Sequence, residues 1–352
     1  MKIVQIITPT RISGAEKYLH NLSQELSNHK HRVIAIIETS QRLIDYIKND
    51  IEVIPLKIEG KGNLFGYYRL KNLIREINPD IIHTHLTTAS WFGGFIGKSL
   101  KIPVVSTVHA LNEKWPYARA DKIIAVSNAV YTNLLKQNVP LQQLEAVQNG
   151  IPLPDKLIMS DSKINELKHQ FNIPAHHQVI GCVAHFSKKK GHEYLLKAFS
   201  QLQNKNVTLL LIGEGSLEGK LIKLCRQLFI YERVIFSGFQ SEMDKIYPLI
   251  DILILPSIKG EGLPLSILEA MNYELPVIAS DISGVGEAVS NNENGYLVSP
   301  KNISEITRKI DLLLKDRELQ KKWGKNGKIK VEQHFNIKKN AQRIVKIYEK
   351  LI

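Results

Sequence analysis

Apolar strand patterns and amphipathic helix patterns alternate along this chain from its first residues to its last. The strand patterns are apolar on both faces, as in parallel sheets that are covered by helices on each side. Regular alternation of this kind is typical of doubly wound α/β domains. In the first half we expect helices at 15–28 and 67–77, and strands at 2–8, 32–38, 51–55, 81–84, 104–109, 122–126 and 144–148.

The strand pattern lapses between residues 152 and 174, and a second alternating set follows. Pro152, Pro154 and Pro174 surround a polar helix pattern at 161–170, a composition that favours a linker. In the second set we expect helices at 192–203, 217–229, 264–272 and 303–315, and strands at 179–184, 207–212, 234–237, 252–256, 276–280 and 295–298.

These patterns predict an α/β protein with two facing Rossmann-like, doubly wound domains and a deep cleft between them. We expect the first domain at 1–155, a linker at 156–175 and the second domain at 176–336. The chain of 352 residues suits two domains of about 150–200 residues each. A basic amphipathic helix at 337–352 is expected to pack back on the first domain. Ligands of such sheets bind beyond the carboxyl ends of the strands.

The composition is that of a soluble globular protein, with 43% hydrophobic and 23% charged residues. No apolar run reaches the roughly 18 residues that cross a bilayer, and the segment 1–7 is too short for the core of a signal sequence. Cys182 and Cys225 fall in a strand pattern and a helix pattern, so we expect both to be reduced core residues. The expected location is the cytoplasm.

The formal net charge of +13 predicts a negatively charged partner: nucleic acid, an anionic membrane or a phosphate-bearing substrate. No nucleic-acid-binding module is recognisable, and the basic residues are not interleaved with stacking aromatic residues, so no nucleic-acid partner is expected. One region fits peripheral contact with an anionic membrane, although the same pattern is typical of a helix that faces a core. It combines apolar and basic residues: Leu64, Phe65, Tyr67, Tyr68, Leu70, Leu73 and Ile74 with Arg69, Lys71 and Arg75.

The segment 256–271 carries the most informative motif. A strand ends at Pro256, a loop with glycines on both sides of Glu261 follows, and Pro264 suits the first turn of a helix. The start of a helix offers free backbone N–H groups and the positive end of a dipole, which suit a diphosphate. Glu269, eight residues after Glu261, can accept hydrogen bonds from a ribose diol. The alternative is an ordinary helix with two solvated carboxylates.

This segment resembles the E-x7-E signature of the retaining glycosyltransferase family called group 1 or family 4. The resemblance covers nearly the whole chain, because further motifs of the family follow in its order: Gly14-Ala15-Glu16, His83-Thr84-His85, Ser106-Thr107-Val108-His109, Ala125-Val126-Ser127, Asn149-Gly150-Ile151, Lys190-Gly191-His192, Gly213-Glu214-Gly215, Ser237-Gly238-Phe239, 275–281, Gly284 with Glu287, and Asn294-Gly295. It implies the GT-B fold, a nucleoside diphosphate sugar as the donor and no cofactor.

The resemblance also implies roles for individual residues. Lys190 matches the lysine that neutralises the departing diphosphate, while Glu261 and His109 match residues around the transferred sugar; these three are the expected catalytic residues. The expected donor-binding residues are Gly14, His185, Lys190, Gly213, Phe239, Gly262, Leu263, Pro264 and Glu269. One position departs from the family, since many relatives have arginine where this chain has His185. A neutral histidine would bind the donor diphosphate more weakly than an arginine. Lys188 is an alternative for part of this role in binding the diphosphate.

Three alternatives remain at the sequence level. His83, His85 and His109 could suggest a zinc site, but no acidic residue or cysteine accompanies them. The segment 213–219 imitates a dinucleotide fingerprint, but its third glycine comes one residue late. A nucleotide-sugar epimerase of similar fold, or a catalytically silent homologue that binds a nucleotide sugar, would share the overall pattern.

The chain contains no Asp-x-Asp, the motif that bridges a metal ion in many other nucleotide-sugar enzymes. This absence predicts that there is no metal site, and the resemblance implies a metal-independent, retaining transferase. By resemblance, the donor is expected to carry UDP, and the acceptor to be a cell-envelope polysaccharide, lipopolysaccharide or lipid-linked glycan. The expected location then extends to the inner face of the plasma membrane.

Overall fold

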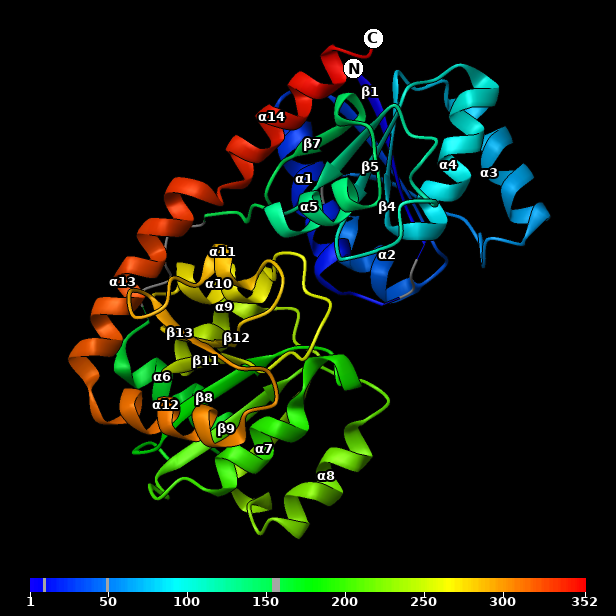
Figure 1. Cartoon of the computed structure of the whole chain (residues 1–352). Helices are drawn as coiled ribbons and strands as arrows, with labels where there is room; N and C mark the ends of the chain where they lie inside the picture. Colours follow the sequence, from blue (N-terminus) through cyan, green and yellow to red (C-terminus); the bar gives the residue numbers. More distant parts are fainter. Residues whose placement is uncertain (9–10, 49–50, 154–158) are drawn as a thin grey trace. The chain divides into compact units, whose positions relative to one another are not determined.

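The computed structural model of this chain describes residues 1–8, 11–48, 51–153 and 159–352 (Figure 1). The chain divides into two compact units. Unit 1 comprises Met1–Pro152 and Phe335–Ile352, and unit 2 comprises Leu153–His334. Each unit is built on one parallel sheet, of seven strands in unit 1 and six in unit 2.

The sheet of unit 1 has the strand order β3-β2-β1-β4-β5-β6-β7, and all neighbouring strands are parallel. Its central strands are buried along almost their whole length, because helices cover the sheet, and the polar residues among them are buried as well. The strands are β1 (Lys2–Ile7), β2 (Arg32–Ile37), β3 (Glu52–Pro55), β4 (Ile81–His85), β5 (Val104–Val108), β6 (Lys122–Ala125) and β7 (Leu144–Ala146).

The helices of unit 1 include the last helix of the chain. They are α1 (Gly14–Asn28), α2 (Gln41–Ile47), α3 (Leu64–Ile77), α4 (Leu86–Leu100), α5 (Asn128–Lys136), the 3-10 turn η1 (Leu141–Gln143) and α14 (Ile337–Glu349). Helix α14 packs against α1 (Figure 1). Between them the Tyr18 hydroxyl donates to Asn340 Oδ1 at 2.8 Å. A parallel bridge between Ile151 and Asn336 leads the chain back into this unit.

The sheet of unit 2 has the order β10-β9-β8-β11-β12-β13, again with parallel neighbours. Its strands are β8 (Gln178–Val183), β9 (Val207–Ile212), β10 (Val234–Gly238), β11 (Ile252–Leu255), β12 (Val277–Ser280) and β13 (Gly295–Val298). Its helices are α6 (Asp161–Gln170), α7 (His192–Ser200), α8 (Glu218–Gln227), α9 (Met243–Ile246), α10 (Leu265–Asn272), α11 (Val285–Ala288), α12 (Ile303–Lys315) and α13 (Arg317–His334), with 3-10 turns η2 (Lys188–Lys190), η3 (Tyr231–Arg233) and η4 (Tyr247–Leu249).

The expected fold class is confirmed, since each unit is a doubly wound, Rossmann-like α/β domain. Every strand expected from the sequence is present, with ends that differ by at most two residues. Cys182 and Cys225 are free and buried, as expected. Helix α6, which we expected in a linker, is part of unit 2, and the linker residues 156–158 and Pro154 lie outside the described residues.

Six α-helices of the described residues were not named from the sequence: α2, α4, α5, α9, α11 and α13. Helix α4 contains three glycines, which usually weaken a helix, but here they let it lie close to the sheet. A Cβ atom added to Gly97 would lie 2.1 Å from Val104 Cγ2. None of the helices within the described ranges combines the length and the apolar content that a membrane span requires.

Candidate functional site

The two sheets each have one point where the strand order reverses, and several of the predicted residues follow the strands that border it. In unit 2 the reversal falls between the neighbours β8 and β11, and in unit 1 between β1 and β4. Successive connections leave such neighbouring strands in opposite directions, which opens a crevice at their carboxyl ends where ligands of doubly wound sheets bind.

Two loops meet at the reversal point of unit 2. The loop after β8 carries Lys190, the loop after β11 carries Glu261, and the Ile258 N–H donates to the Lys189 carbonyl at 2.8 Å. Gly191 has φ 68°, and a Cβ atom added there would lie 2.0 Å from the Pro256 carbonyl oxygen. Only glycine fits this close approach, so the two loops are tied to each other by the backbone.

The tied loops bring two of the predicted catalytic residues into contact. Lys190 Nζ donates to Glu261 Oε1 at 2.6 Å, and the Ser257 hydroxyl donates to the same oxygen. The Glu261 side chain is 8% exposed and that of Lys190 is 28% exposed. A carboxylate this buried needs a charged or hydrogen-bonding partner, and Lys190 and Ser257 supply both.

Gly262, Leu263 and Pro264 lead directly into α10. Pro264 is the N-cap residue and the helix begins at Leu265, one residue later than expected. All three leading residues are buried, and they are followed by the positive end of the helix dipole. The first turn of α10 therefore favours a negatively charged group.

Glu269 lies half-buried on α10 and is held by a residue that the sequence did not reveal. The Tyr247 hydroxyl donates to Glu269 Oε2 at 2.7 Å. Tyr247 is fully buried and stacks on Tyr273, with ring centroids 5.2 Å apart. Burial and the nearby Glu269 carboxylate raise the pKa of Tyr247 well above 10, so its hydroxyl keeps the proton that it donates.

Gly213, His185 and Phe239 lie at the same edge of the unit 2 sheet. Gly213 has φ 141°, its N–H donates to the Gly238 carbonyl at 2.9 Å, and an added Cβ would lie 2.3 Å from the Ala184 carbonyl oxygen. The fold alone therefore requires glycine at 213. His185 and Phe239 are half-buried in the loops that follow β8 and β10.

Gly14 begins α1, after the first strand of unit 1. The Ser13 N–H donates to Glu16 Oε2 at 2.8 Å, which is one half of a capping box that holds the start of the helix. A Cβ atom added to Gly14 would meet no atom within 4 Å. The described part of the chain therefore leaves open space at this position.

Three histidines lie at the ends of β4 and β5. His83 Nδ1 lies 2.5 Å from the Tyr348 hydroxyl and its Nε2 lies 2.7 Å from Thr107 Oγ1. His85 Nδ1 lies 3.0 Å from His109 Nε2. Burial lowers the pKa of His83 to about 3, and burial also lowers the pKa values of His85 and His109, so all three rings are neutral near pH 7.

Both ring nitrogens of His83 thus face hydroxyl groups of the chain. Within the described ranges, no group of three or more His, Cys, Asp or Glu residues is placed to hold a metal ion. Of the residues expected to act together, Lys190 and Glu261 are in contact in unit 2, whereas Gly14 and His109 belong to unit 1.

Two sequence families match this chain. "Glycosyl transferases group 1" matches residues 163–330, and "Glycosyltransferase Family 4" matches residues 12–154. Together they span most of both units.

Characterised relatives match at low identity over long stretches. N-acetyl-alpha-D-glucosaminyl L-malate synthase of Bacillus anthracis is 24% identical over 298 residues, which are 80% of this chain and 76% of the relative. UDP-Gal:alpha-D-GlcNAc-diphosphoundecaprenol alpha-1,3-galactosyltransferase of Escherichia coli is 24% identical over 379 residues, covering 99% of this chain and 96% of the relative.

Among solved structures, Anabaena HepE in complex with UDP and glucose has a TM-score of 0.90 at 21% identity, covering 99% of this chain and 100% of HepE. The structure of WaaG, a glycosyltransferase of lipopolysaccharide biosynthesis, has a TM-score of 0.78 at 15% identity, covering 98% of this chain and 99% of WaaG. These neighbours identify the fold as GT-B. With both family matches, they establish that this chain belongs to the group 1, or family 4, glycosyltransferases.

Proposed function

We propose that this glycosyltransferase transfers a sugar from a UDP-sugar to an acceptor hydroxyl, with retention of the anomeric configuration. The acceptor class that we propose is a cell-envelope polysaccharide, a lipopolysaccharide or a lipid-linked glycan. The E. coli relative is named for a UDP-Gal donor and a diphosphoundecaprenol-linked sugar, and the HepE crystals contain UDP and glucose.

The ion pair between Lys190 and Glu261 is the observation that carries this proposal. It lies at the reversal point of the unit 2 sheet, just before the start of α10. In the proposed reaction the diphosphate of the donor replaces Glu261 as the partner of Lys190. The released carboxylate then accepts hydrogen bonds from the transferred sugar. The lysine stabilises the charge that develops on the departing diphosphate, a task that a divalent ion performs in other enzymes.

The nucleotide is proposed to bind along the same edge of unit 2. Glu269, oriented by Tyr247, accepts hydrogen bonds from the ribose diol. The start of α10 at Gly262, Leu263 and Pro264 faces the diphosphate. Gly213 and Phe239 line the nucleotide side, and His185 takes the position of the arginine of many relatives.

In unit 1, Gly14 is proposed to leave room for the donor phosphates, and His109 to contact the transferred sugar. The open space around Gly14 supports its role, because no atom of the described chain occupies the place of a side chain there. During transfer, the bond between the sugar C1 and the diphosphate oxygen breaks, and a bond from C1 to the acceptor oxygen forms. The acceptor proton passes to the departing phosphate, so no separate enzymatic base is required.

A panel of nucleotide sugars tests the proposal. Each compound is added to the purified protein in EDTA, thermal stability is measured, and compounds that stabilise the protein are then assayed for transfer. Stabilisation by UDP-sugars with transfer to an acceptor supports the proposal. Isomerisation of the sugar without an acceptor would instead indicate an epimerase, and binding without any reaction would indicate a catalytically silent homologue.

We also propose that unit 1 contacts an anionic membrane through the start of α3, because three large apolar side chains are exposed there. Leu64 is 69% exposed, Phe65 is 84% exposed and Tyr68 is 59% exposed. The other apolar residues of this region face the core: Leu70 and Ile74 are buried, and Tyr67 and Leu73 pack against buried residues. The sequence pattern thus combines a core-facing helix with an exposed apolar end.

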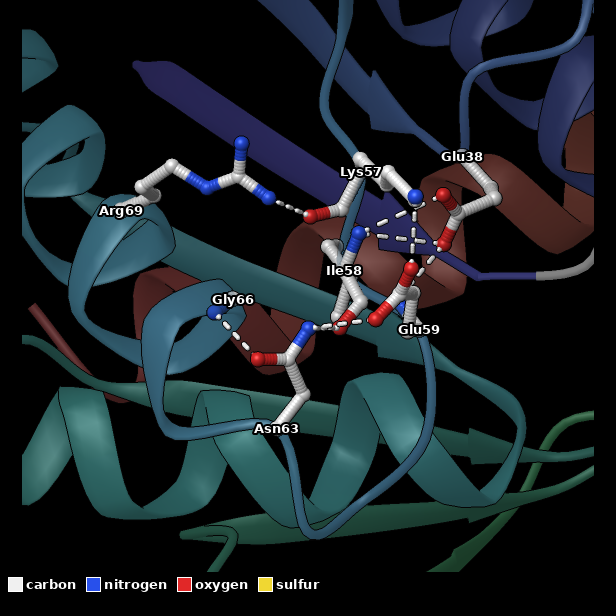
Figure 2. A network of polar contacts seen from close by, with 7 residues as sticks. All are labelled: Glu38, Lys57, Ile58, Glu59, Asn63, Gly66 and Arg69. Atoms are coloured by element: carbon white, nitrogen blue, oxygen red, sulfur yellow. Dashed lines mark hydrogen bonds and ion pairs between the residues drawn. The ribbon is translucent and has the colours of Figure 1, made fainter.

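A polar network holds this end in place (Figure 2). Glu38 accepts hydrogen bonds from the Ile58 and Glu59 N–H groups, and Asn63 Oδ1 accepts from the Gly66 N–H at 3.1 Å. Arg69 donates to the Lys57 carbonyl across the loop (Figure 2). The exposed apolar residues are therefore presented on an ordered helix start.

Basic residues make an anionic bilayer the partner that fits this surface. Arg69 and Arg75 are exposed on α3, and Lys61 lies 3.9 Å from the ring centroid of Trp115, which is itself 47% exposed. Apolar side chains that enter the interface beside cations are the pattern of peripheral membrane helices.

Flotation with vesicles that contain phosphatidylglycerol tests this contact. We expect the protein to float with anionic vesicles at low salt, and F65S/Y68S to lose binding by about tenfold. The matched control is Phe229→Ser in unit 2, where the replaced ring is 95% exposed, and this variant is expected to bind like the wild type. Absence of flotation at low salt, or equal loss in the control, would reject the membrane contact.

A further inference from the structure

A chain of hydrogen bonds runs from the interior of unit 1 to His109. Gln5 Nε2 donates to Ser23 Oγ at 2.7 Å, Gln5 Oε1 lies 2.7 Å from His85 Nε2, and His85 Nδ1 lies 3.0 Å from His109 Nε2. Gln5, Ser23 and His85 are completely buried, and His109 is half-buried at the end of the chain. Water therefore does not compete for the hydrogen bonds between Gln5, Ser23 and His85.

The direction of each hydrogen bond follows from the one at Gln5. The Gln5 amide is oriented with Nε2 on Ser23 Oγ, so its Oε1 faces His85. An amide oxygen can only accept, and in this orientation His85 Nε2 carries the proton. His85 is neutral because burial, with the nearby His83 and His109, lowers its pKa well below 6.5. Its Nδ1 is then unprotonated and can only accept a hydrogen bond, which His109 Nε2 must donate.

We propose that Gln5, acting through His85, sets His109 in the tautomer that is protonated on Nε2 and unprotonated on Nδ1. Gln5 and His85 are positioning residues, since both are completely buried and act only through His109. No hydrogen bond to His109 Nδ1 is made by the described part of the chain. This nitrogen is thus presented as a hydrogen-bond acceptor rather than as a proton donor.

The tautomer determines which chemical groups of a ligand can form a hydrogen bond with His109 Nδ1. A bare imidazole nitrogen accepts from a hydroxyl or an amide N–H, and it offers no proton to a phosphate oxygen. Taken with the proposed function, on which this step alone rests, His109 accepts from a hydroxyl of the transferred sugar. The ring is also held in place by Tyr18, whose edge faces it at a centroid distance of 5.4 Å.

Nuclear magnetic resonance measures the tautomer directly and needs no substrate. The full chain is labelled with 15N-histidine, long-range 1H–15N correlations are recorded at pH 7.5, and His109→Gln assigns the His109 signals. We expect His109 and His85 both to be protonated on Nε2. A His109 ring protonated on Nδ1 would overturn the proposal, whether or not the protein transfers sugar.

Variants of Gln5 separate positioning from packing. Gln5→Met keeps the side-chain length but removes the acceptor, so His109 should show mixed tautomers, with kcat for transfer falling about tenfold. The Kd for UDP should stay unchanged, because Gln5 and His85 touch none of the residues proposed to bind the nucleotide or its phosphates. Ser23→Ala leaves Gln5 Oε1 in place and serves as the control. An unchanged tautomer in a folded Gln5→Met variant would also overturn the proposal.

Discussion

Lys190 and Glu261 are 71 positions apart in the sequence, yet Lys190 Nζ lies 2.6 Å from Glu261 Oε1. The pair exists because β8 and β11 are neighbours in the sheet, which places the loops that follow them side by side. In the proposed reaction this lysine exchanges the carboxylate for the diphosphate of the donor. The pair therefore couples the stability of unit 2 to the proposed donor site.

Replacing either Lys190 or Glu261 alone is expected to lower the free energy of unfolding. Replacing both should lower it by less than the two single losses added together. Lys190→Met leaves the buried Glu261 carboxylate with Ser257 alone, so the free energy of unfolding should fall by roughly 1–3 kcal/mol. In the double variant K190M/E261Q no buried charge remains, and part of this loss should be recovered. Urea unfolding of the wild type, both single variants and the double variant measures the coupling. Strict additivity would show that the ion pair does not stabilise the fold.

The Tyr247 hydroxyl is expected to matter for nucleotide binding and little for folding. Tyr247→Phe keeps the stacking on Tyr273 but leaves Glu269 without the donor that orients it. We expect the Kd for UDP to rise about five- to tenfold, the worth of one hydrogen bond to a charged group. Titration calorimetry measures this, with Tyr231→Phe on the surface of the same unit as the matched control. Equal affinities in Tyr247→Phe and the control would mean that Glu269 needs no such support.

Alanine substitutions of two glycines at the candidate site should have different effects on Tm. Gly191→Ala places a Cβ 2.0 Å from the Pro256 carbonyl oxygen, so the protein should lose several degrees in Tm. Gly14→Ala meets no atom within 4 Å and should leave Tm unchanged. If donor phosphates approach Gly14 as proposed, the same variant should raise KM for the UDP-sugar. Thermal unfolding together with donor kinetics distinguishes these outcomes, and an unaffected KM would remove Gly14 from the donor site.

Buried histidines should make the protein less stable as the pH falls below 6.5. Burial lowers the pKa values of His83 and His192 to about 3, whereas in the unfolded chain both titrate near 6.5. The unfolded state therefore binds more protons between these values, and the free energy of unfolding should decrease by up to about 1.4 kcal/mol per pH unit for each histidine. Above pH 6.5 this contribution is complete and no longer changes with pH.

His192 and His83 form a matched pair for testing that slope. Neither ring nitrogen of the buried His192 has a hydrogen-bond partner in the described structure, so His192→Leu should change stability little at pH 7 and reduce the slope below pH 6.5. His83→Leu should cost about 2 kcal/mol or more, because it leaves the Tyr348 and Thr107 hydroxyls without their partner. Urea unfolding from pH 4.5 to 8 measures both effects. A His192→Leu slope equal to that of the wild type would show that this histidine is already protonated when folded.

The strands could be predicted from the sequence because their evidence is local. Each is a short run of continuous or alternating apolar residues, bounded by turn residues. The helix α4 could not, since its glycines oppose helix formation and are explained only by the sheet beneath them. Helix α13 was missed for a different reason: it is largely polar, and few of its residues, such as Trp323 and Val331, are buried.

The candidate site shows the same division between local and distant information. The loop around Glu261 and the start of α10 follow from adjacent residues, so their geometry was within reach of the sequence. The contacts of Lys190 with Glu261 and of Gln5 with His85 depend on which strands are neighbours. The contact of Tyr247 with Glu269 depends on how α10 folds back along β11. A single sequence does not contain strand order in any local pattern, and these partners were therefore not predicted.

The most direct test of the account is titration calorimetry of UDP into the protein in EDTA, compared between the wild type and Glu269→Gln. The account predicts that UDP binds the wild type without a divalent ion, and that the variant binds at least tenfold more weakly because the ribose diol loses a charged acceptor. Absence of binding until a divalent ion is added, or equal affinity in the wild type and the variant, would contradict it.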